Sequence, residues 1–517
     1  MRKQLLLTTL LTFTGLTAGS LAQAAELTAD QACQSLTSLN DNSVTVTSVT
    51  RIAGHNTEYG NDLSAFCRMT ATLRPSADSD IRVEVWLPEH WNGSYLGTGN
   101  GGLGGKLDKT ALEDGVRRGF AVANTDLGTS AGAAAMTGKM DMVADFGYRA
   151  THLMTLLAKA AIVQYYHRPP SWSFFRGCST GGGQGMHEAQ QFPADYNGIL
   201  AGAPGASRVP AHLAFFWAYR ATHLTPDSAL TPAALTFWSA KVMQACDKLD
   251  GLQDGIISDP QRCTLNPQTV QCKPGQSSEC LTPGQVVALN KIYAGPRHSV
   301  TGEQIFPGYL HGTEAVFNLF EMDENGGPPA AFPFIWLWGQ HWDWKRFNFG
   351  SDVDVMRNAL DQSVAATNPD LSAFHRLGGK LIMYQGLADP IQVPGAAIDY
   401  VKAVHHTLGS QASDTVQLFL APGMNHCDGG NAPNDFGNFN DDNATYAANR
   451  QDAQHDLLNA LQNWVEKGVK PTQVIATQFT SHKPAQVIRT RPLCAWPETA
   501  HYRGGNVNQA QSFYCAK

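Results

Sequence analysis

The feature that most constrains the fold is a serine flanked by glycines, placed between a predicted strand and a predicted helix. Residues 172–176 predict a buried strand, the pattern G-x-S-x-G follows at 177–181, and glycines 181–183 begin a helix. A turn this sharp needs small flanking residues, because larger side chains would clash with the neighbouring backbone. Ser179 is therefore expected in a strained conformation at the carboxyl edge of a sheet, with its hydroxyl exposed.

Strands and helices alternate on both sides of this motif. The segment 81–97 predicts two paired strands, 81–87 and 95–96, joined by a turn at Pro88–Gly93. The remaining predicted elements are strand 120–124, helix 145–166, strand 380–384, helix 395–408, strand 416–420 and helix 444–467. Such alternation favours a parallel sheet covered by helices on both faces.

Residues 204–369 interrupt this alternation. The segment is rich in proline, glycine and aromatic residues and holds four of the ten cysteines. Its aromatic residues concentrate in Phe332–Trp338 and in His341–Trp344. We interpret 204–369 as an inserted lid domain, with residues 25–203 and 370–517 forming the core.

Asp389 and His426 are the candidate partners of Ser179. Each lies just past the end of a predicted strand, where open α/β sheets place their reactive groups. The order serine, acid, histidine is that of the α/β-hydrolase fold, so we predict this fold with a large inserted lid. His426 would accept the Ser179 proton, and Asp389 would orient the imidazole. The alternative interpretations are a turn carboxylate before Pro390 and an ordinary loop histidine.

Two cysteines flank the candidate triad. Cys178 precedes Ser179 and Cys427 follows His426, so contact between the serine and the histidine would bring the two cysteines within bonding distance. The predicted Cys178–Cys427 disulfide would close a loop of 427 − 178 = 249 residues, for which chain entropy predicts a stabilisation of about 5 kcal/mol. The alternative makes Cys178 a free thiol nucleophile.

A glycine-rich loop follows the strand at 95–96. Oxyanion holes of this fold use one backbone N–H after the nucleophile and one from an early loop. We therefore expect the N–H groups of Thr180 and Gly101 to form the oxyanion hole. The loop lacks the lysine of a phosphate-binding loop and matches GxGxxG poorly, which argues against a nucleotide site.

The amino terminus predicts export. Arg2 and Lys3 precede an apolar stretch at 5–16, and Ala22-Gln23-Ala24 supplies a cleavage site, so residues 1–24 predict a signal peptide. The apolar stretch is too short to span a bilayer comfortably. We expect a secreted or periplasmic protein that is not bound to a membrane. Its net charge of −7, without clusters of basic residues, argues against nucleic-acid binding.

The even number of cysteines agrees with export. They are Cys33, Cys67, Cys178, Cys246, Cys263, Cys272, Cys280, Cys427, Cys494 and Cys515. In an oxidising compartment an even count favours disulfides, and the absence of a CxxC pair argues against a zinc ribbon.

An acidic loop within the lid predicts a metal site. Asp247, Asp250 and Asp254 are spaced by three and four residues, and Gly251 and Gly255 make a continuous helix unfavourable. Three carboxylates in a folded loop would repel one another without a cation, and calcium suits oxygen ligands better than zinc does. We predict a structural calcium ion; the alternative is a solvated acidic face.

Taken together, these motifs resemble the tannase and feruloyl esterase family, which includes mono(2-hydroxyethyl) terephthalate hydrolase. The resemblance covers nearly all of the mature chain and rests on segments 100–102, 177–182, 247–256 and 425–427 together with Asp389. It implies catalytic roles for Ser179, Asp389 and His426, tied by Cys178–Cys427. Thr180 is as in feruloyl esterases and tannases, whereas the terephthalate enzyme has an acidic residue there.

The same resemblance implies calcium ligands and disulfides. The ligands would be the side chains of Asp247, Asp250 and Asp254 and the backbone oxygens of Leu252 and Ile256. The other disulfides implied are Cys33–Cys67, Cys246–Cys263, Cys272–Cys280 and Cys494–Cys515.

The expected activity is hydrolysis of aromatic-acid esters through an acyl-enzyme, with feruloyl and other hydroxycinnamoyl esters as the leading substrates. The substrate would be a small aromatic ester, free or attached to a plant polysaccharide or polyphenol, and the aromatic lid residues would bury its ring. Galloyl esters and mono(2-hydroxyethyl) terephthalate are the alternative substrates. A non-catalytic secreted binding protein is the alternative of another class.

Overall fold

In the described part of the chain, nine strands form the central sheet, in the order β1-β2-β3-β5-β4-β6-β7-β8-β9. The computed structural model describes residues 28–517 except 60–61, 224, 325, 439–451 and 481–485. The signal peptide predicted at 1–24 lies outside the described residues. The pairs β1–β2, β2–β3 and β3–β5 are antiparallel. The pairs β5–β4, β4–β6, β6–β7, β7–β8 and β8–β9 are parallel.

The strands of the sheet alternate their side chains between two apolar cores. In β6, Phe175 packs into one core and Phe174 into the other, and β8 divides Met383 and Ile382 in the same way. The sheet strands are β1 (Val44–Ile52), β2 (Phe66–Leu73), β3 (Ile81–Pro88), β4 (Ser94–Thr98), β5 (Ala121–Thr125), β6 (Trp172–Cys178), β7 (Gly198–Gly202), β8 (Lys380–Gly386) and β9 (Val416–Ala421). The parallel strands β4 to β9 are buried on both faces and are therefore largely apolar on both sides, as is usual for parallel sheets, whereas β1 has partly exposed side chains.

Helices cover both faces of the sheet. Buried side chains of α4, α5 and α12 belong to the first core, and those of α2 and α13 belong to the second. The helices outside the lid are α1 (Ala29–Gln34), α2 (Lys109–Arg117), α3 (Met140–Ala144), α4 (Ala150–Tyr166), α5 (Thr180–Gln191), α11 (Ser372–Arg376), α12 (Pro394–Leu408) and α13 (Leu457–Lys467). Two small hairpins, β10–β11 (Gln473–Phe479, Val487–Cys494) and β12–β13 (Thr499–Tyr502, Phe513–Ala516), lie near the carboxyl terminus.

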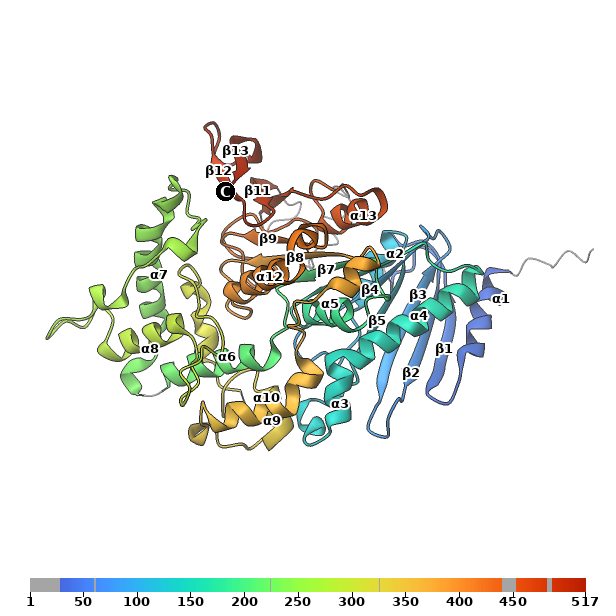
Figure 1. The fold of residues 1–517 in the computed structure, drawn as a ribbon, viewed down its shortest axis with the longest axis horizontal. Helices are drawn as coiled ribbons and strands as arrows, with labels where there is room; N and C mark the ends of the chain where they lie inside the picture. The colour runs from blue at the N-terminus through green and yellow to red at the C-terminus, as the bar shows by residue number, and fades with distance from the viewer. Residues whose placement is uncertain (1–27, 60–61, 224, 325, 439–451, 481–485) are drawn as a thin grey trace, which may run out of the picture.

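In the residues that the structure describes, the segment between β7 and β8 contains several helices and contributes no strand to the central sheet. It contains α6 (Arg208–Thr222), α7 (Pro232–Cys246), α8 (Pro283–Ala294), α9 (Phe332–Trp338) and α10 (Ser351–Val364). Figure 1 shows α6, α7, α8 and α9 in green and yellow to one side of the sheet. A third apolar core, built around Trp238 and Phe317, joins α6, α7 and α8.

Two predicted elements need correction. Strands β3 and β4 are not paired, because β5 lies between them and β4 runs parallel to both β5 and β6. The helix predicted at 444–467 begins at Leu457, where the Asp456 side chain accepts a hydrogen bond from the Asn459 N–H. Residues 444–451 of that prediction lie outside the described residues.

Among the described helices, none combines the length and the apolar character needed to cross a bilayer.

Candidate active site

Ser179 occupies the turn between β6 and α5 in a backbone conformation that favours glycine. Its φ is 61° and its ψ is −119°. The turn requires glycine on both sides, because a Cβ on Gly177 would lie 2.6 Å from the Gly181 carbonyl carbon and one on Gly99 would collide with the Gly181 Cα. The glycines thus let the chain turn tightly, so that Ser179 is held at the sheet edge by packing.

Asp389 and His426 form a hydrogen-bonded pair beside this turn. The His426 Nδ1 lies 2.9 Å from Asp389 Oδ2 and 3.1 Å from Oδ1. Asp389 is fully buried and accepts further hydrogen bonds from the N–H groups of Ile391 and Gln392 and from the Gln385 side chain. Because all these groups are donors, they fix a carboxylate, which in turn fixes the imidazole with its Nδ1 protonated and its Nε2 free.

The cysteines form five disulfides, and none of the ten is free. Cys178 and Cys427 are bonded, with their Cα atoms 5.9 Å apart. The other pairs are Cys33–Cys67, Cys246–Cys263, Cys272–Cys280 and Cys494–Cys515. A bonded Cys178 cannot serve as a thiol nucleophile, which removes that alternative. The bond joins the Ser179 turn directly to the His426 loop.

Two backbone N–H groups are available near Ser179. Within the described chain, neither the Thr180 N–H nor the Gly101 N–H donates a hydrogen bond, whereas the N–H of Asn100 donates to the Gln184 side chain. The two segments are held together, since the Gly181 N–H donates to the Asn100 carbonyl at 2.7 Å. The arrangement offers two free donors of the kind that an oxyanion hole uses.

A cavity of about 530 Å³ joins these groups. Its wall includes Ser179, His426 and Gly101, and the lid supplies Phe215 and Phe332. The Ser179 hydroxyl makes no hydrogen bond to any described residue, so the hydrogen bond between Ser179 and His426 is not formed here. Catalytic hydrogen bonds of this kind are often long when no substrate is bound. The cavity is large enough for an aromatic ester.

Only part of the aromatic segment of the lid reaches this cavity. Phe332 lines it, but Trp336 is completely buried against Phe146, and Phe334 stacks on Trp342 at 4.6 Å. Trp336 thus packs the lid segment against the core, and Phe334 and Trp342 stabilise the lid segment itself, because aromatic pairs that are removed from water are favourable.

Several cavity residues could not be found from sequence patterns. Arg208, Ala211, His212 and Phe215 lie on one face of α6 and line the cavity. The His212 Nδ1 lies 2.7 Å from the Ala330 carbonyl, and burial, with a smaller effect of Arg208, lowers the pKa of His212 to about 3. The polar residues Arg208 and His212, at positions i and i+4 in the mostly apolar first turns of α6, are only a weak sequence signal for such a site.

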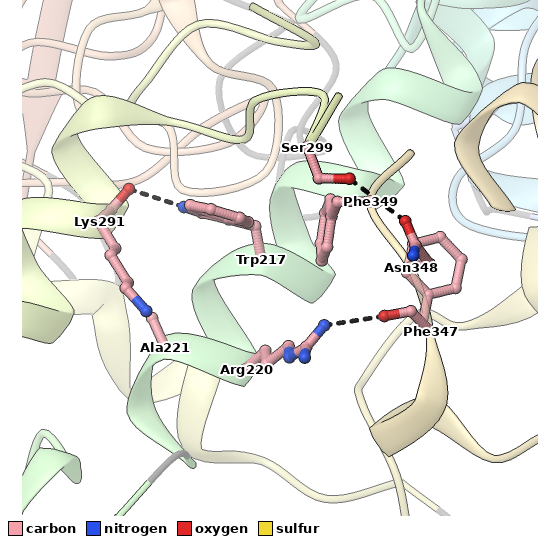
Figure 2. A pocket seen from close by; sticks show the side chains of 8 residues that line it. All are labelled: Trp217, Arg220, Ala221, Lys291, Ser299, Phe347, Asn348 and Phe349. Atoms are coloured by element: carbon pink, nitrogen blue, oxygen red, sulfur yellow. Dashed lines mark hydrogen bonds between the residues drawn. The ribbon is translucent and has the colours of Figure 1, made fainter. Parts of the chain in front are cut away.

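The opposite face of α6 lines a different pocket. Figure 2 shows Trp217, Arg220 and Ala221 beside Lys291 of α8, Ser299 and the segment 347–349. Arg220 donates a hydrogen bond to the Phe347 carbonyl at 2.9 Å. None of the candidate catalytic residues lines this pocket of about 360 Å³.

The predicted calcium loop is folded, but its carboxylates do not surround one point. Asp254 pairs with Arg491 at 2.6 Å, and Asp247 accepts a hydrogen bond from the Gly255 N–H. The aspartates of the loop are therefore not a compact ligand group. Among the described residues, the one group of three side chains whose ligand atoms lie within 4.8 Å of one another is elsewhere, at His152, Glu188 and Asp195. The carbonyls of Leu252 and Ile256 accept no hydrogen bond from a described residue. Carboxylate and carbonyl oxygens are the ligand types that calcium prefers. The aspartate side chains would, however, have to move closer together to bind one ion.

Comparisons with known proteins agree with this geometry. The model of a family described as tannase and feruloyl esterase matches residues 67–325 and 340–516. An esterase of Xanthomonas campestris pv. campestris is 34% identical over 94% of this chain and 91% of its own. A protein of Arthroderma benhamiae named "Probable feruloyl esterase" is 32% identical over 87% of this chain and 86% of its own.

Solved structures show the same architecture. Feruloyl esterase B from Aspergillus oryzae superposes with a TM-score of 0.84 and 27% identity, covering 95% of this chain and all of that one. Tannin acyl hydrolase from Aspergillus niger gives a TM-score of 0.74 at 20% identity, over 94% of this chain and 95% of its own, and supports the fold alone. The protein is therefore a carboxylic ester hydrolase with an α/β-hydrolase fold. It belongs to the tannase and feruloyl esterase family.

Proposed function

We propose that the protein hydrolyses esters of aromatic acids, with feruloyl and other hydroxycinnamoyl esters as its main substrates. The observation that carries this proposal is the convergence of Ser179, the His426–Asp389 pair and two free backbone donors on one cavity with aromatic walls. The relatives named as feruloyl esterases support the choice of acyl group.

The proposed reaction proceeds through an acyl-enzyme. The Ser179 Oγ attacks the ester carbonyl while the His426 Nε2 accepts its proton, and the N–H groups of Thr180 and Gly101 stabilise the oxyanion. His426 then protonates the leaving alcohol, and the acyl group remains on Ser179. A water molecule, deprotonated by His426, releases the acid and regenerates the serine. Asp389 stabilises the imidazolium that forms in both steps.

The test is a comparison of initial rates on methyl ferulate, methyl gallate and mono(2-hydroxyethyl) terephthalate. We expect methyl ferulate to give the highest kcat/KM of the three. A preference for methyl gallate would make the protein a tannase in function, and a preference for the terephthalate ester would assign it to that branch of the family. Absence of turnover on all three would contradict the proposal.

We also propose that residues 1–24 are removed on export and that the mature enzyme works in the periplasm or outside the cell. The five disulfides support this, because such bonds persist in oxidising compartments. The substrate would then be an aromatic ester, free or attached to a plant polysaccharide or polyphenol.

We further propose a structural calcium ion in the lid loop, held by Asp247, Asp250 and Asp254 and by the carbonyls of Leu252 and Ile256. The free carbonyls and the spacing of the aspartates support this ligand set. An ion bound to the folded state alone stabilises it, so chelation should lower the Tm by a few degrees.

The calcium proposal is tested by differential scanning calorimetry with EDTA and with added Ca²⁺ or Mg²⁺. We expect EDTA to lower the Tm, Ca²⁺ to restore it, and Asp250→Asn to remove the difference. Asp259→Asn, just outside the ligand set, is the control and should keep it. An unchanged Tm of the wild type in EDTA would contradict the proposal.

A further inference from the structure

Three side chains of types that bind metal ions meet outside the catalytic cavity. They are His152 of α4, Glu188 of α5 and Asp195 of the loop between α5 and β7. One potential ligand atom of each lies within 4.8 Å of those of the other two, and the His152 Nδ1 is 2.7 Å from Asp195 Oδ2. The proposed hydrolysis uses none of these residues, so their meeting calls for a separate explanation.

Glu188 is the member of this cluster that points to a ligand. Its side chain faces the other two, the residue is only 1% exposed, and neither carboxylate oxygen forms a hydrogen bond with a described residue. The buried carboxylates of Asp114 and Asp145, in contrast, each accept a hydrogen bond from an arginine. Burying a carboxylate without any partner is unfavourable, so Glu188 requires either a proton or a cation.

Lys159 is a cation of the same region, but it does not pair with Glu188. Its ammonium group donates a hydrogen bond to the Asp195 backbone carbonyl at 2.5 Å and lies 3.9 Å from Asp195 Oδ1. One ammonium group and two carboxylates leave one negative charge while His152 is neutral. A proton shared by Glu188 and Asp195 would draw the two carboxyl groups into a hydrogen bond, which Glu188 does not form here.

The cluster is held in place and can be reached from solvent. The His152 ring stacks on Phe192 with the ring centroids 3.8 Å apart, and the Phe192 carbonyl accepts the Asp195 N–H at 2.9 Å. The side chain of His152 is 24% exposed, which gives an ion a path to the buried carboxylates. Imidazole and carboxylate together are ligands for zinc, whereas calcium and magnesium prefer oxygen ligands alone.

We propose that His152, Glu188 and Asp195 form a structural binding site for a divalent transition-metal ion, with zinc as the ion that fits these ligands best. The ion supplies the partner that Glu188 lacks and ties α5 to α4 and to the loop after α5. Glu188 follows Ser179 by 188 − 179 = 9 residues, about 13 Å along the helix, so the ion does not touch the substrate. The site does not depend on the proposed function.

The test is calorimetric titration of Zn²⁺ into the full-length mature enzyme after EDTA treatment and dialysis, with excess Ca²⁺ present to occupy the loop at 247–256. We expect one tight Zn²⁺ per chain. Glu188→Gln keeps the shape of the side chain but removes its charge, and it should weaken the binding at least tenfold. His152→Gln should do the same. His406→Gln, which changes an exposed histidine of α12, is the matched control and should bind Zn²⁺ like the wild type.

The Tm gives a second measurement. Zn²⁺ should raise the Tm of the wild type and of His406→Gln by a few degrees, because it binds the folded state, and should leave the Tm of Glu188→Gln unchanged. If Glu188→Gln does not fold, His152→Gln decides alone, since it changes a partly exposed residue. Zinc binding that is equally tight in the wild type and in the folded site variants would overturn the proposal. Absence of binding to the wild type would also overturn it and would leave Glu188 as a buried protonated acid.

Discussion

Ser179→Ala is expected to lower kcat for the preferred aromatic ester by about 10⁴- to 10⁶-fold. The variant keeps the cavity, the free N–H groups of Thr180 and Gly101 and the His426–Asp389 pair, but it lacks the atom that would bond to the acyl carbon. Residual activity would come from binding and oxyanion stabilisation alone. The measurement is steady-state hydrolysis, with the Tm as a check that the fold is retained.

Ser207→Ala provides the matched control. Ser207 precedes α6 and its side chain does not cap the helix. The control variant should hydrolyse the ester within a few-fold of the wild type. A Ser179→Ala enzyme that retained more than a few per cent of wild-type kcat would show that another group is the nucleophile.

Asp389→Asn is expected to lower kcat by about 10⁴-fold while leaving the fold intact. An amide at this position has the shape of the carboxylate but only one acceptor oxygen, whereas the backbone N–H groups of Ile391 and Gln392, the Gln385 amide and the His426 Nδ1–H all need acceptors here. The imidazole would lose the partner that fixes its tautomer and stabilises its protonated form.

A control variant, and kcat measured across the pH range of activity, separate loss of the Asp389 carboxylate from general damage to the fold. Asp399→Asn changes a surface carboxylate of α12 that pairs with Lys402 at 3.6 Å, and it should leave kcat unchanged. A loss of less than tenfold in Asp389→Asn across the pH range of activity would contradict the assigned role.

The site could be predicted from the sequence where function depends on local backbone geometry. The glycines at 177 and 181 are needed because the backbones of β6, α5 and the Gly99 loop touch, and that constraint is visible in the residue types themselves. The cysteines next to Ser179 and His426 indicate a long-range contact, because Cys178 and Cys427 are 249 residues apart in the sequence and form a disulfide. The α/β-hydrolase fold followed from the same local patterns.

Other features depend on tertiary contacts that local patterns do not encode. The order β3-β5-β4 could not be read from the turn at 88–93, because a strand inserted from later in the chain leaves no mark on that turn. The antiparallel strands β1 and β2 were not predicted; β1 is an edge strand with partly exposed side chains, so its apolar signal is weak. Arg208 belongs to no sequence motif, and only its burial without an ion pair to a described residue sets it apart.

Trapping the acyl-enzyme shows directly whether Ser179 is the nucleophile. The wild type is mixed with methyl ferulate, quenched in acid within the first turnovers, digested, and examined by mass spectrometry. We expect a feruloyl group on the hydroxyl of Ser179, in the peptide that stays linked through the Cys178–Cys427 disulfide until reduction. Hydrolysis of the ester with an adduct on a different residue would contradict this expectation.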